Sequence, residues 1–481
     1  MAALEEVRVG AKTLDRLQSI LSPDAFGEAL KAAAAMRERL FQRVVWNVNS
    51  TAAGGGVAEM LQSLLGYTRG LGVDSRWLVV QGNDPFFRVT KRLHHALHGE
   101  PGDGSPLGPD EHEIYEQTLG SAALELRRLA RPGDFVLLHD PQTAGLAPAL
   151  AQTGVHVIWR CHIGSEDPSP EARRGWAFLE PYLKTVPDFV FSREAYVPEF
   201  ADHGKSTIIT PSIDPLSAKN QDLPADDIAA ILVHTGLVEG PVPDGGSCSF
   251  LRDDGTPGRV SRQVDVVRSG RAPAADTPLV VQVSRWDPLK DMAGVMDGFA
   301  RLVTAHPELE GELVLAGPDV RSVADDPEGI MVFNDVVERW RALPAAVRDR
   351  VHLASLPMDD VQENAIIVNA LQRHATVVVQ KSLREGFGLT VTEAMWKGRP
   401  VVASALGGIL DQIEDGVSGV LIADPSDPNQ LAEALCAVLQ DPERAEAIGA
   451  CAHERVRERF LGVGHLVHYA QLLQQIDTEG R

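Results

Sequence analysis

The chain has 481 residues, and its 45 lysines and arginines against 67 aspartates and glutamates give a formal charge of −22 at pH 7. This acidic balance argues against broad binding to nucleic acid or to anionic membranes, although it leaves room for a local basic pocket. With 44% hydrophobic and 23% charged residues, the composition is typical of a globular protein of about two or three domains, each large enough for its own core.

Cysteine usage and the N-terminus favour a cytoplasmic location. The four cysteines lie far apart and form no Cys-x-x-Cys pair, which is typical of reduced thiols in the cytosol. The first residues carry early acids and lack the apolar stretch of a signal peptide. No apolar run approaches the roughly 18 residues that a membrane helix needs, so we expect no membrane partner.

Residues 41–237 predict a first α/β domain. Residues 1–40 have helical spacing and are expected to form an N-terminal extension packed on this domain. A strand at 43–49 is followed by glycines at 54–56 and a helix that begins at Val57, which is the first unit of a doubly wound sheet. Alternating elements continue, which indicates a parallel sheet covered on both faces. The further strands are expected at 75–80, 134–138, 155–160, 189–192 and 207–210.

Polar residues follow several of these strands. In an open α/β sheet, ligands usually bind in the crevice at the carboxyl ends of the strands. His139 and Asp140 follow one strand, and Arg160 and His162 stand at the end of another. A histidine by itself is more often structural, but a glycine loop at the same edge favours a functional role. The glycine loop lacks the Gly-x-Gly-x-x-Gly spacing, so a dinucleotide site is not expected.

Residues 238–277 interrupt the alternation with clusters of Gly, Pro and Asp. We expect a linker or insertion there, and a solvated loop is a better interpretation than a partner surface. The second domain, expected at 278–460, again alternates strands with helices, and residues 461–481 have helical spacing.

Two cations open this second domain. A buried strand at 278–284 is directly followed by Arg285 and Lys290, which stand five positions apart before a helix. Arginine as a fork and lysine as a point charge can converge on a diphosphate from such positions.

The stretch from 375 to 397 carries the strongest candidate site. A short buried strand at 375–380 is followed by a turn with two glycines and by a helix expected at 390–397. Glycines let the backbone approach a ligand closely, and the free N–H groups at a helix start favour an anion such as phosphate. Glu385 before the helix and Glu393 about one turn inside it suit hydroxyl groups better than phosphate.

Glu385 and Glu393, with Gly-Phe-Gly-Leu between them, resemble the nucleotide-sugar-binding motif of retaining GT-B glycosyltransferases of family four. The resemblance implies that Glu385 lies by the hydroxyls of the donor sugar, and that Glu393 holds the ribose. It also implies that Arg285 and Lys290 bind the donor diphosphate, and that Leu356 lies by the nucleobase. The backbone positions that would meet sugar and phosphates are Gly386, Phe387, Gly388 and Leu389.

Four further stretches, at 54–59, 139–142, 160–163 and 211–217, resemble the trehalose glycosyltransferring synthases, to which the trehalose phosphorylases are related. The similarity covers most of the chain and implies a GT-B fold, in which two Rossmann-like domains face a cleft and a last helix often returns to the first domain. One departure is Gly164, which stands where the family pattern has an aspartate after a His-Ile pair.

The same resemblance assigns residues of the first domain. Gly55 and Gly56 would contact the donor at the cleft. The acceptor sugar would lie against Gly54, Gly55, Asp140 and His162.

The reaction that this resemblance implies moves glucose from an NDP-glucose to glucose with retention and forms α,α-trehalose. His162, Arg285, Lys290 and Glu385 would be the catalytic residues. The two cations would stabilise charge on the leaving diphosphate, which itself takes the acceptor's proton, while His162 positions the sugar. No Asp-x-Asp stands at a strand end, so we expect neither a cofactor nor a required metal.

Three alternatives stay open. The chain could be a retaining trehalose phosphorylase, an NDP-sugar transferase with another acceptor, or a sugar-nucleotide-binding protein without catalysis. The sequence also leaves a homodimer open.

Overall fold

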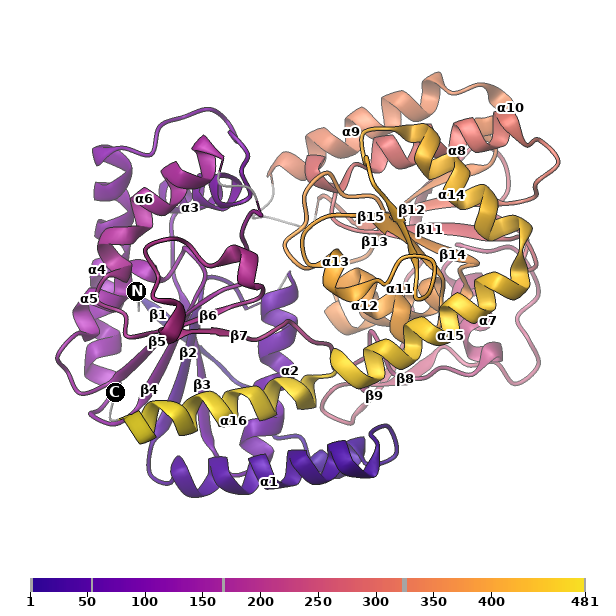
Figure 1. The fold of residues 1–481 in the computed structure, drawn as a ribbon. Coiled ribbons are helices and arrows are strands. Elements are labelled where there is room, and N and C mark those ends of the chain that lie inside the picture. The colour runs from indigo at the N-terminus through magenta and orange to yellow at the C-terminus, as the bar shows by residue number, and fades with distance from the viewer. Residues whose placement is uncertain (1–2, 53–54, 167–168, 322–326, 480–481) are drawn as a thin grey trace. The chain divides into compact units, whose positions relative to one another are not determined.

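The computed structural model describes residues 3–52, 55–166, 169–321 and 327–479, and its fold is drawn in Figure 1. The chain divides into two compact units, one formed by residues 1–212 with 460–481 and the other by residues 213–459. Within the described residues, each unit contains a seven-stranded sheet with helices packed on it, which confirms the predicted α/β class.

The first unit is built on a sheet with the strand order β1-β3-β2-β4-β5-β6-β7. All neighbouring pairs are parallel except β1 with β3, which are antiparallel. The expectation that residues 1–40 only pack on this domain is therefore incomplete, because β1 is an edge strand of its sheet. The strands are β1 (Leu4–Val7), β2 (Val44–Asn49), β3 (Asp74–Val80), β4 (Phe135–His139), β5 (His156–Cys161), β6 (Asp188–Phe191) and β7 (Ser206–Ile208).

Side-chain caps fix where several helices of the first unit begin. Ser22, Asn83 and Ser169 each accept a hydrogen bond from a backbone N–H three residues later, and a proline follows in the first turn of each helix. The helices are α1 (Pro23–Arg39), α2 (Gly56–Gly70), α3 (Asp84–Leu97), α4 (Pro109–Leu129), α5 (Ala147–Leu150), α6 (Pro170–Leu183) and α16 (Gly462–Glu479). Short 3₁₀ turns are η1 (Leu14–Leu17), η2 (Ala144–Leu146), η3 (Glu194–Tyr196) and η4 (His203–Lys205).

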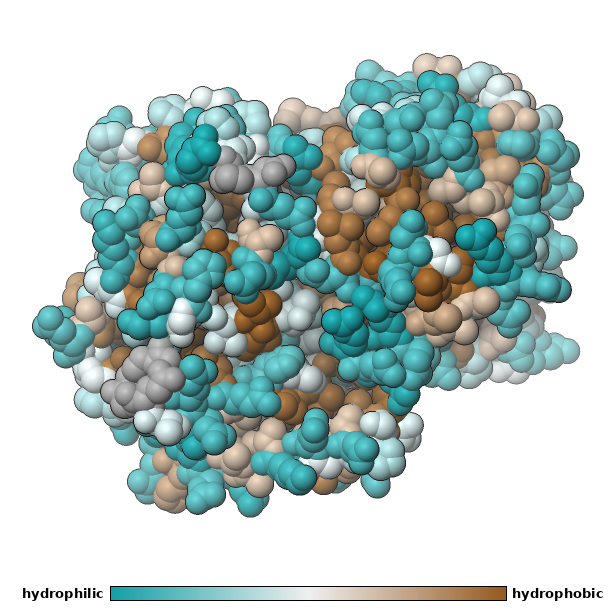
Figure 2. All heavy atoms as spheres, viewed as in Figure 1, coloured by the Kyte–Doolittle hydropathy of each residue, from teal (hydrophilic) through white to brown (hydrophobic). Residues whose placement is uncertain are grey.

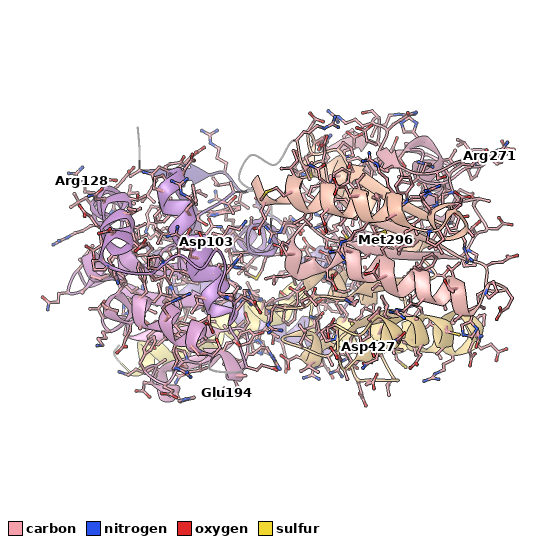
Figure 3. All side chains as sticks on the ribbon, turned by 90° about the horizontal axis from the view of Figure 1, so that it is seen from above. Asp103, Arg128, Glu194, Arg271, Met296 and Asp427 are labelled. Atoms are coloured by element: carbon pink, nitrogen blue, oxygen red, sulfur yellow. The ribbon has the colours of Figure 1, made fainter. Side chains whose placement is uncertain are left out.

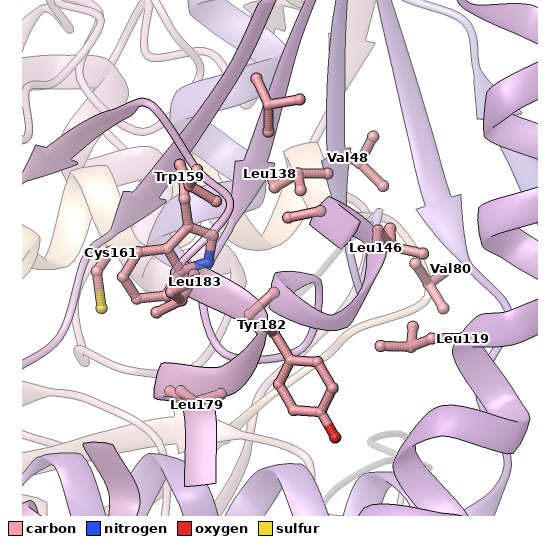
Figure 4. Packing of buried hydrophobic residues seen from close by; sticks show 14 of the residues in the cluster. Val48, Val80, Leu119, Leu138, Leu146, Trp159, Cys161, Leu179, Tyr182 and Leu183 are labelled. Atoms are coloured by element: carbon pink, nitrogen blue, oxygen red, sulfur yellow. The ribbon is translucent and has the colours of Figure 1, made fainter. Parts of the chain in front are cut away.

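The core of the first unit holds the ends of its strands in place. Trp159 on β5 is fully buried, and in Figure 4 it lies beside Leu183 of α6. Its indole N–H donates to the carbonyl oxygen of Asp140 at 3.2 Å. The apolar core is therefore joined directly to the polar residue that follows β4.

The last helix, α16, belongs to the first unit and packs on α1 and α2. Leu466, Tyr469, Leu473 and Ile476 are buried, at the three- and four-residue spacing of one helix face. Arg39 of α1 donates to the carboxylate of Asp477 at 3.2 Å. Helix α16 therefore completes the packing of α1 and α2 in the first unit.

The second unit is built on a sheet with the strand order β10-β13-β12-β11-β14-β15-β16, parallel except for the pair of β10 with β13. The strands are β10 (Asp265–Val267), β11 (Leu279–Val283), β12 (Glu312–Pro318), β13 (Val351–Leu356), β14 (Val377–Gln380), β15 (Val401–Ser404) and β16 (Val420–Ile422). The helices are α7 (Ala225–His234), α8 (Met292–Ala305), α9 (Pro327–Ala342), α10 (Ala345–Arg348), α11 (Val361–His374), α12 (Leu389–Trp396), α13 (Ile409–Gln412), α14 (Pro428–Gln440) and α15 (Pro442–Arg459), with the 3₁₀ turn η5 (Pro288–Lys290) before α8.

Helix α8 shows how this unit is covered. Met296 lies on α8 and is buried against the sheet, whereas Arg271 extends from the surface (Figure 3). The β-branched runs of β11 and β14 are buried along their whole length, as a central parallel strand requires.

Residues 213–237 pack with the second unit, so the boundary lies earlier than the expected 237/238. Helix α7 packs on α11, and the carbonyl oxygen of Asn220 accepts from the indole N–H of Trp396 at 3.1 Å. In the sequence, the alternation of helices and strands continues through residues 213–237 and suggests that they belong to the first domain. Their buried contacts place them in the second unit instead.

The expectation of a solvated linker at 238–277 is wrong. This segment contains β10 and a two-stranded ribbon of β8 (Ser249–Leu251) and β9 (Pro257–Arg259). Arg252 forms an ion pair with Asp360, and the backbone N–H groups of Ser261 and Arg262 donate to the buried carboxylate of Glu363. The Gly, Pro and Asp clusters therefore shape turns of an ordered segment.

Hydrophilic side chains cover most of the face drawn in Figure 2. Of the helices in the described part of the chain, none combines the length and the apolar character needed to cross a membrane.

Truncating a core side chain of α16 tests its contribution to the first unit. Ile476 is 0% exposed, so Ile476→Ala should destabilise this unit by about 2–5 kcal/mol through lost burial and a residual cavity. Native-state hydrogen exchange of the β2 and β4 amides reports on this unit alone. Gln471→Ala on the exposed side of α16 is the control, and equal protection in both variants would contradict the packing described.

Candidate active site

The glycine loop of the first unit leads directly into α2. Gly55 has φ +136°, which favours glycine, and is the N-cap residue of α2, whose first residue is Gly56. Both are exposed, and the first N–H groups of a helix have no partner within it. This backbone is therefore suited to a polar or anionic ligand. Gly54 lies outside the described residues.

Asp140 and His162 are brought together at the ends of β4 and β5. Asp140 has a left-handed backbone, with φ +63°, and its Oδ1 accepts from the backbone N–H of His162 at 2.8 Å. Burial raises the pKa of Asp140 to about 7, against the opposing effects of this hydrogen bond and of the Arg160 charge. Near neutral pH this carboxyl group can therefore either donate or accept a hydrogen bond.

Arg160, fully buried on β5, organises the polar side chains around it. Its Nη1 donates to Nε2 of His465 at 2.7 Å and to the hydroxyl of Tyr469, both on α16. Its Nη2 donates to the carbonyl oxygen of Ile209 at 3.2 Å, and its Nε to Nδ1 of His162 at 3.4 Å. A buried cation needs such acceptors, since leaving it without them costs several kcal/mol.

These contacts define the proton positions on the histidines. A guanidinium group can only donate, so Nδ1 of His162 must accept and its proton is on Nε2. That N–H donates to Nδ1 of His139 at 3.3 Å, and Nε2 of His139 donates to Oδ1 of Asn47 at 3.1 Å. His162 is therefore arranged as a hydrogen-bond donor toward its surroundings.

Burial keeps this cluster neutral. Burial, with the Arg160 charge second, lowers the pKa of His139 to about 3 and the pKa values of His162 and His465 well below the usual range of histidine. A His162 whose pKa is lowered by burial and whose Nδ1 accepts from Arg160 is a weak general base. Its geometry fits the predicted positioning role.

The second unit brings Lys290 and Glu385 into direct contact. Nζ of Lys290 lies 2.6 Å from Oε2 of Glu385, which also accepts from the hydroxyl of Ser382 at 3.1 Å. Their side chains are only 19% and 8% exposed, so the pair is poorly screened by water. Two residues that are 95 positions apart thus form one group at the ends of β11 and β14.

Arg285 is the most accessible of the predicted catalytic residues. Its side chain is 52% exposed, and Nη2 lies 3.6 Å from Oδ2 of Asp287. A loose ion pair of this kind contributes little to stability, so the guanidinium can turn toward an incoming anion at small cost.

The turn before α12 is held by backbone contacts. Gly388 has φ +83° and precedes α12, and a Cβ on it would lie 3.1 Å from Cγ of Glu385. The N–H of Gly408 donates to the carbonyl oxygen of Gly386 at 2.9 Å, and the side chain of Phe387 is buried. The helix begins at Leu389, and in its first turn the N–H of Val391 donates to the carbonyl oxygen of Gly388 at 2.9 Å.

Glu393 and Leu356 lie deeper than their predicted roles suggest. Glu393 is 3% exposed, and its Oε1 is 3.6 Å from Nζ of Lys219. Burial lowers the pKa of the neighbouring Lys397 to about 7, although the charge of Glu393 acts in the opposite direction. The side chain of Leu356 is 1% exposed, and its carbonyl oxygen already accepts from the N–H of Asp319 at 2.8 Å.

Several residues of this site were not predicted. Nζ of the buried Lys381 contacts the carboxylate of Asp291, which also caps α8 through the N–H of Gly294 at 3.0 Å. Gln282 donates to the carbonyl oxygen of Lys290 at 2.8 Å and accepts from the N–H of Lys381 at 3.1 Å. These contacts join the ends of β11 and β14. Lys381 stands four residues before Glu385, and this closeness to the motif was the signal in the sequence that pointed to it.

The described residues contain no group of three or more His, Cys, Asp or Glu side chains arranged to hold a metal ion.

Two family models match the chain. Residues 47–198 match the model of the trehalose synthase N-terminal domain, and residues 362–455 match that of glycosyl transferases group 1. Solved structures of the same fold include sucrose-phosphate synthase from Thermosynechococcus elongatus, with a TM-score of 0.61, 19% identity, and coverage of 91% of this chain and 100% of that one. An α,α-trehalose-phosphate synthase from Burkholderia vietnamiensis has a TM-score of 0.64, 17% identity, and coverage of 89% and 98%. The fold is that of the GT-B glycosyltransferases.

Similar proteins with known functions indicate one family within the GT-B glycosyltransferases. Trehalose synthase from Pyrococcus horikoshii is 33% identical over 478 residues, which cover 99% of each chain. Trehalose synthase from Rubrobacter xylanophilus is 36% identical over 466 residues, which cover 95% of each chain. The protein belongs to the trehalose synthase family of glycosyltransferases, which confirms the predicted resemblance.

The neutral histidine cluster predicts an acid-sensitive first unit. Because the folded-state pKa values lie below that of an unfolded histidine, the stabilising contribution is complete above about pH 6.5 and is lost as the pH falls toward 3. Each histidine contributes at most about 1.4 kcal/mol per pH unit in this window. His162→Gln should reduce the slope of the unfolding free energy against pH by about one proton.

Urea unfolding between pH 5 and 7 measures that slope. His203→Gln, at an exposed histidine of the same unit, is the control and should leave it unchanged. An unchanged slope in His162→Gln would mean that this histidine is not held neutral in the fold.

Proposed function

We propose that this protein is a retaining glycosyltransferase that moves glucose from an NDP-glucose to glucose and so forms α,α-trehalose. The observation that carries the proposal is the Lys290–Glu385 pair beside the start of α12. A cation, a carboxylate and a helix start at one strand edge match the phosphate and hydroxyl groups of a nucleotide sugar. The trehalose synthases that align over nearly the whole chain support the choice of product.

The donor would bind on the second unit. Lys290 and the exposed Arg285 can neutralise the diphosphate as its bond to the anomeric carbon breaks, while Glu385 can accept from sugar hydroxyls. Donors already fixed in place stabilise developing charge without reorganising during the reaction. Cationic side chains can supply this stabilisation in place of a divalent ion, so the proposal includes activity without metal or another cofactor.

The acceptor would bind on the first unit. His162 offers an N–H to an oxygen of a sugar, and a bound hydroxyl would share or replace His139 as its acceptor. Asp140, with its raised pKa, is the neighbouring polar group. Because His162 is a weak base, the acceptor hydroxyl would transfer its proton to the departing diphosphate oxygen as the new bond to the anomeric carbon forms on the same face.

A trehalose phosphorylase is the second candidate. Trehalose phosphorylase from Pleurotus pulmonarius is 25% identical over 95% of this chain, although that alignment covers only 60% of the phosphorylase. The deep burial of Glu393 also weakens the assignment of a ribose contact. Product analysis separates the two reactions.

The proposal includes a cytoplasmic location, which the four free cysteines support. A homodimer stays an expectation from the sequence.

The reaction is tested with purified protein, glucose and UDP-, ADP- or GDP-glucose in EDTA, beside trehalose with phosphate. We expect α,α-trehalose from at least one nucleotide sugar, with the configuration at both anomeric carbons assigned by NMR. A β configuration at the anomeric carbon that comes from an isotope-labelled donor would contradict retention. Glucose 1-phosphate from trehalose and phosphate alone would move the protein to the phosphorylases.

Lys290→Ala should reduce kcat/KM by a factor that corresponds to about 2–4 kcal/mol of transition-state stabilisation, as for a lost oxyanion donor. Glu385→Ala should also remove most turnover, through lost sugar contacts. Since the two side chains touch, the double variant should lose less than the sum of the single losses.

Steady-state kinetics with the preferred donor measure these changes, and Arg301→Ala on the exposed face of α8 is the control. A change confined to KM in Lys290→Ala would limit this residue to ground-state binding. Near-normal kcat/KM in Glu385→Ala would remove its assigned role.

A further inference from the structure

A pocket of about 790 Å³ lies at the edge of the first sheet opposite to the candidate active site. It is lined where β2, β3 and β4 begin, at Val44, Asp74 and Asp134. Asn49, at the other end of β2, lies five residues further along the strand than Val44, which is about 16 Å in extended backbone. The pocket is therefore separate from the residues assigned to donor and acceptor.

The pocket is rich in arginine, in a chain with a net charge of −22. Its lining includes Arg37, Arg43, Arg76, Arg128 and Arg131. Such a concentration of cations runs against the overall charge, and a concave surface focuses its field.

The two acids of the pocket are already engaged. The carboxylate of Asp134 accepts from the N–H groups of Val44 and Arg131, each at 2.9 Å, and from the indole of Trp46 at 3.2 Å. Asp74 forms a two-point pair with Arg76, with both distances 3.0 Å. These partners of the two carboxylates are groups other than the guanidinium groups of Arg37, Arg128 and Arg131.

Three cations remain available to a ligand. Across the residues that the structure describes, no hydrogen bond or ion pair engages the side chains of Arg37, Arg128 or Arg131, and all three residues are exposed. Arg43, by contrast, pairs with Asp477 and lies over the ring of Phe135 at 4.4 Å. Exposed guanidinium groups around one concavity repel one another unless an anion joins them.

Apolar surface lies beside these charges. Phe41 is 73% exposed and Leu129 is 38% exposed, and both line the pocket. A volume of this size suits a small molecule rather than a macromolecule. The acidic remainder of the chain would also repel a polyanion.

We propose that this pocket binds a small phosphate ester through Arg37, Arg128 and Arg131, with the organic part of the ester against Phe41 and Leu129. A phosphate dianion matches several guanidinium forks at once, whereas a single carboxylate satisfies one. The site lies beyond the proposed glycosyl transfer and does not depend on it.

Titration calorimetry of the full-length protein tests the site, with glucose 6-phosphate as the probe and with inorganic phosphate and glucose alongside. We expect Arg128→Gln/Arg131→Gln to weaken glucose 6-phosphate binding by at least roughly tenfold, the loss expected for one charge-assisted contact. Arg127 is exposed on α4 beside Arg128 but does not line the pocket, so Arg127→Gln should bind glucose 6-phosphate as the wild type does.

Two further variants separate this site from the candidate active site. Binding should persist in Lys290→Ala and in His162→Gln, which alter the donor and acceptor sides. Loss of binding in either of these, with the arginine variant unaffected, would overturn the proposal, as would no binding to the wild type. Equal affinity for inorganic phosphate would overturn the ester, and binding of glucose alone would overturn the phosphate contact.

Discussion

The first unit depends on one buried cation, Arg160. A guanidinium at 0% exposure is tolerable only where acceptors surround it, and here they come from β5, from the backbone after β7 and from α16. This single requirement orders His162, fixes its proton and holds the last helix against the sheet. The same hydrogen bonds therefore stabilise the first unit and position His162. A substitution of His465 on α16 is expected to alter the position of His162 through Arg160.

In the second unit, buried charges are stabilised by opposite charges in direct contact. Lys381 and Asp291 join the ends of two strands below the surface, and Gln282 bridges their backbones. Above them, Lys290 and Glu385 are held in register by these fixed ends. The buried Lys381–Asp291 pair stabilises the strand ends, and the partly accessible Lys290–Glu385 pair can contact a ligand.

Local patterns in the sequence were sufficient for the α/β class, for most strands and for the motif around Glu385. Arg160 shows the limit of such patterns, because its partners His465 and Tyr469 lie 305 and 309 positions away and nothing near Arg160 indicates them. The segment 238–277 was misinterpreted for the same reason, since Asp360 and Glu363, which order it, lie about a hundred residues further on. Burial of Glu393 and Leu356 likewise depends on packing that spacing alone does not specify.

The contact between Lys290 and Glu385 means that the site contains its own counter-ion before any ligand arrives. If an anion binds the ammonium of Lys290, the carboxylate of Glu385 loses a hydrogen-bond donor. If a hydroxyl group binds the carboxylate of Glu385 in its place, the ammonium of Lys290 loses an acceptor. Either fragment alone exchanges one contact for another and gains little. A ligand that offers an anionic group beside hydroxyl donors satisfies both partners at once, so this pair favours such a ligand over one that offers either group alone.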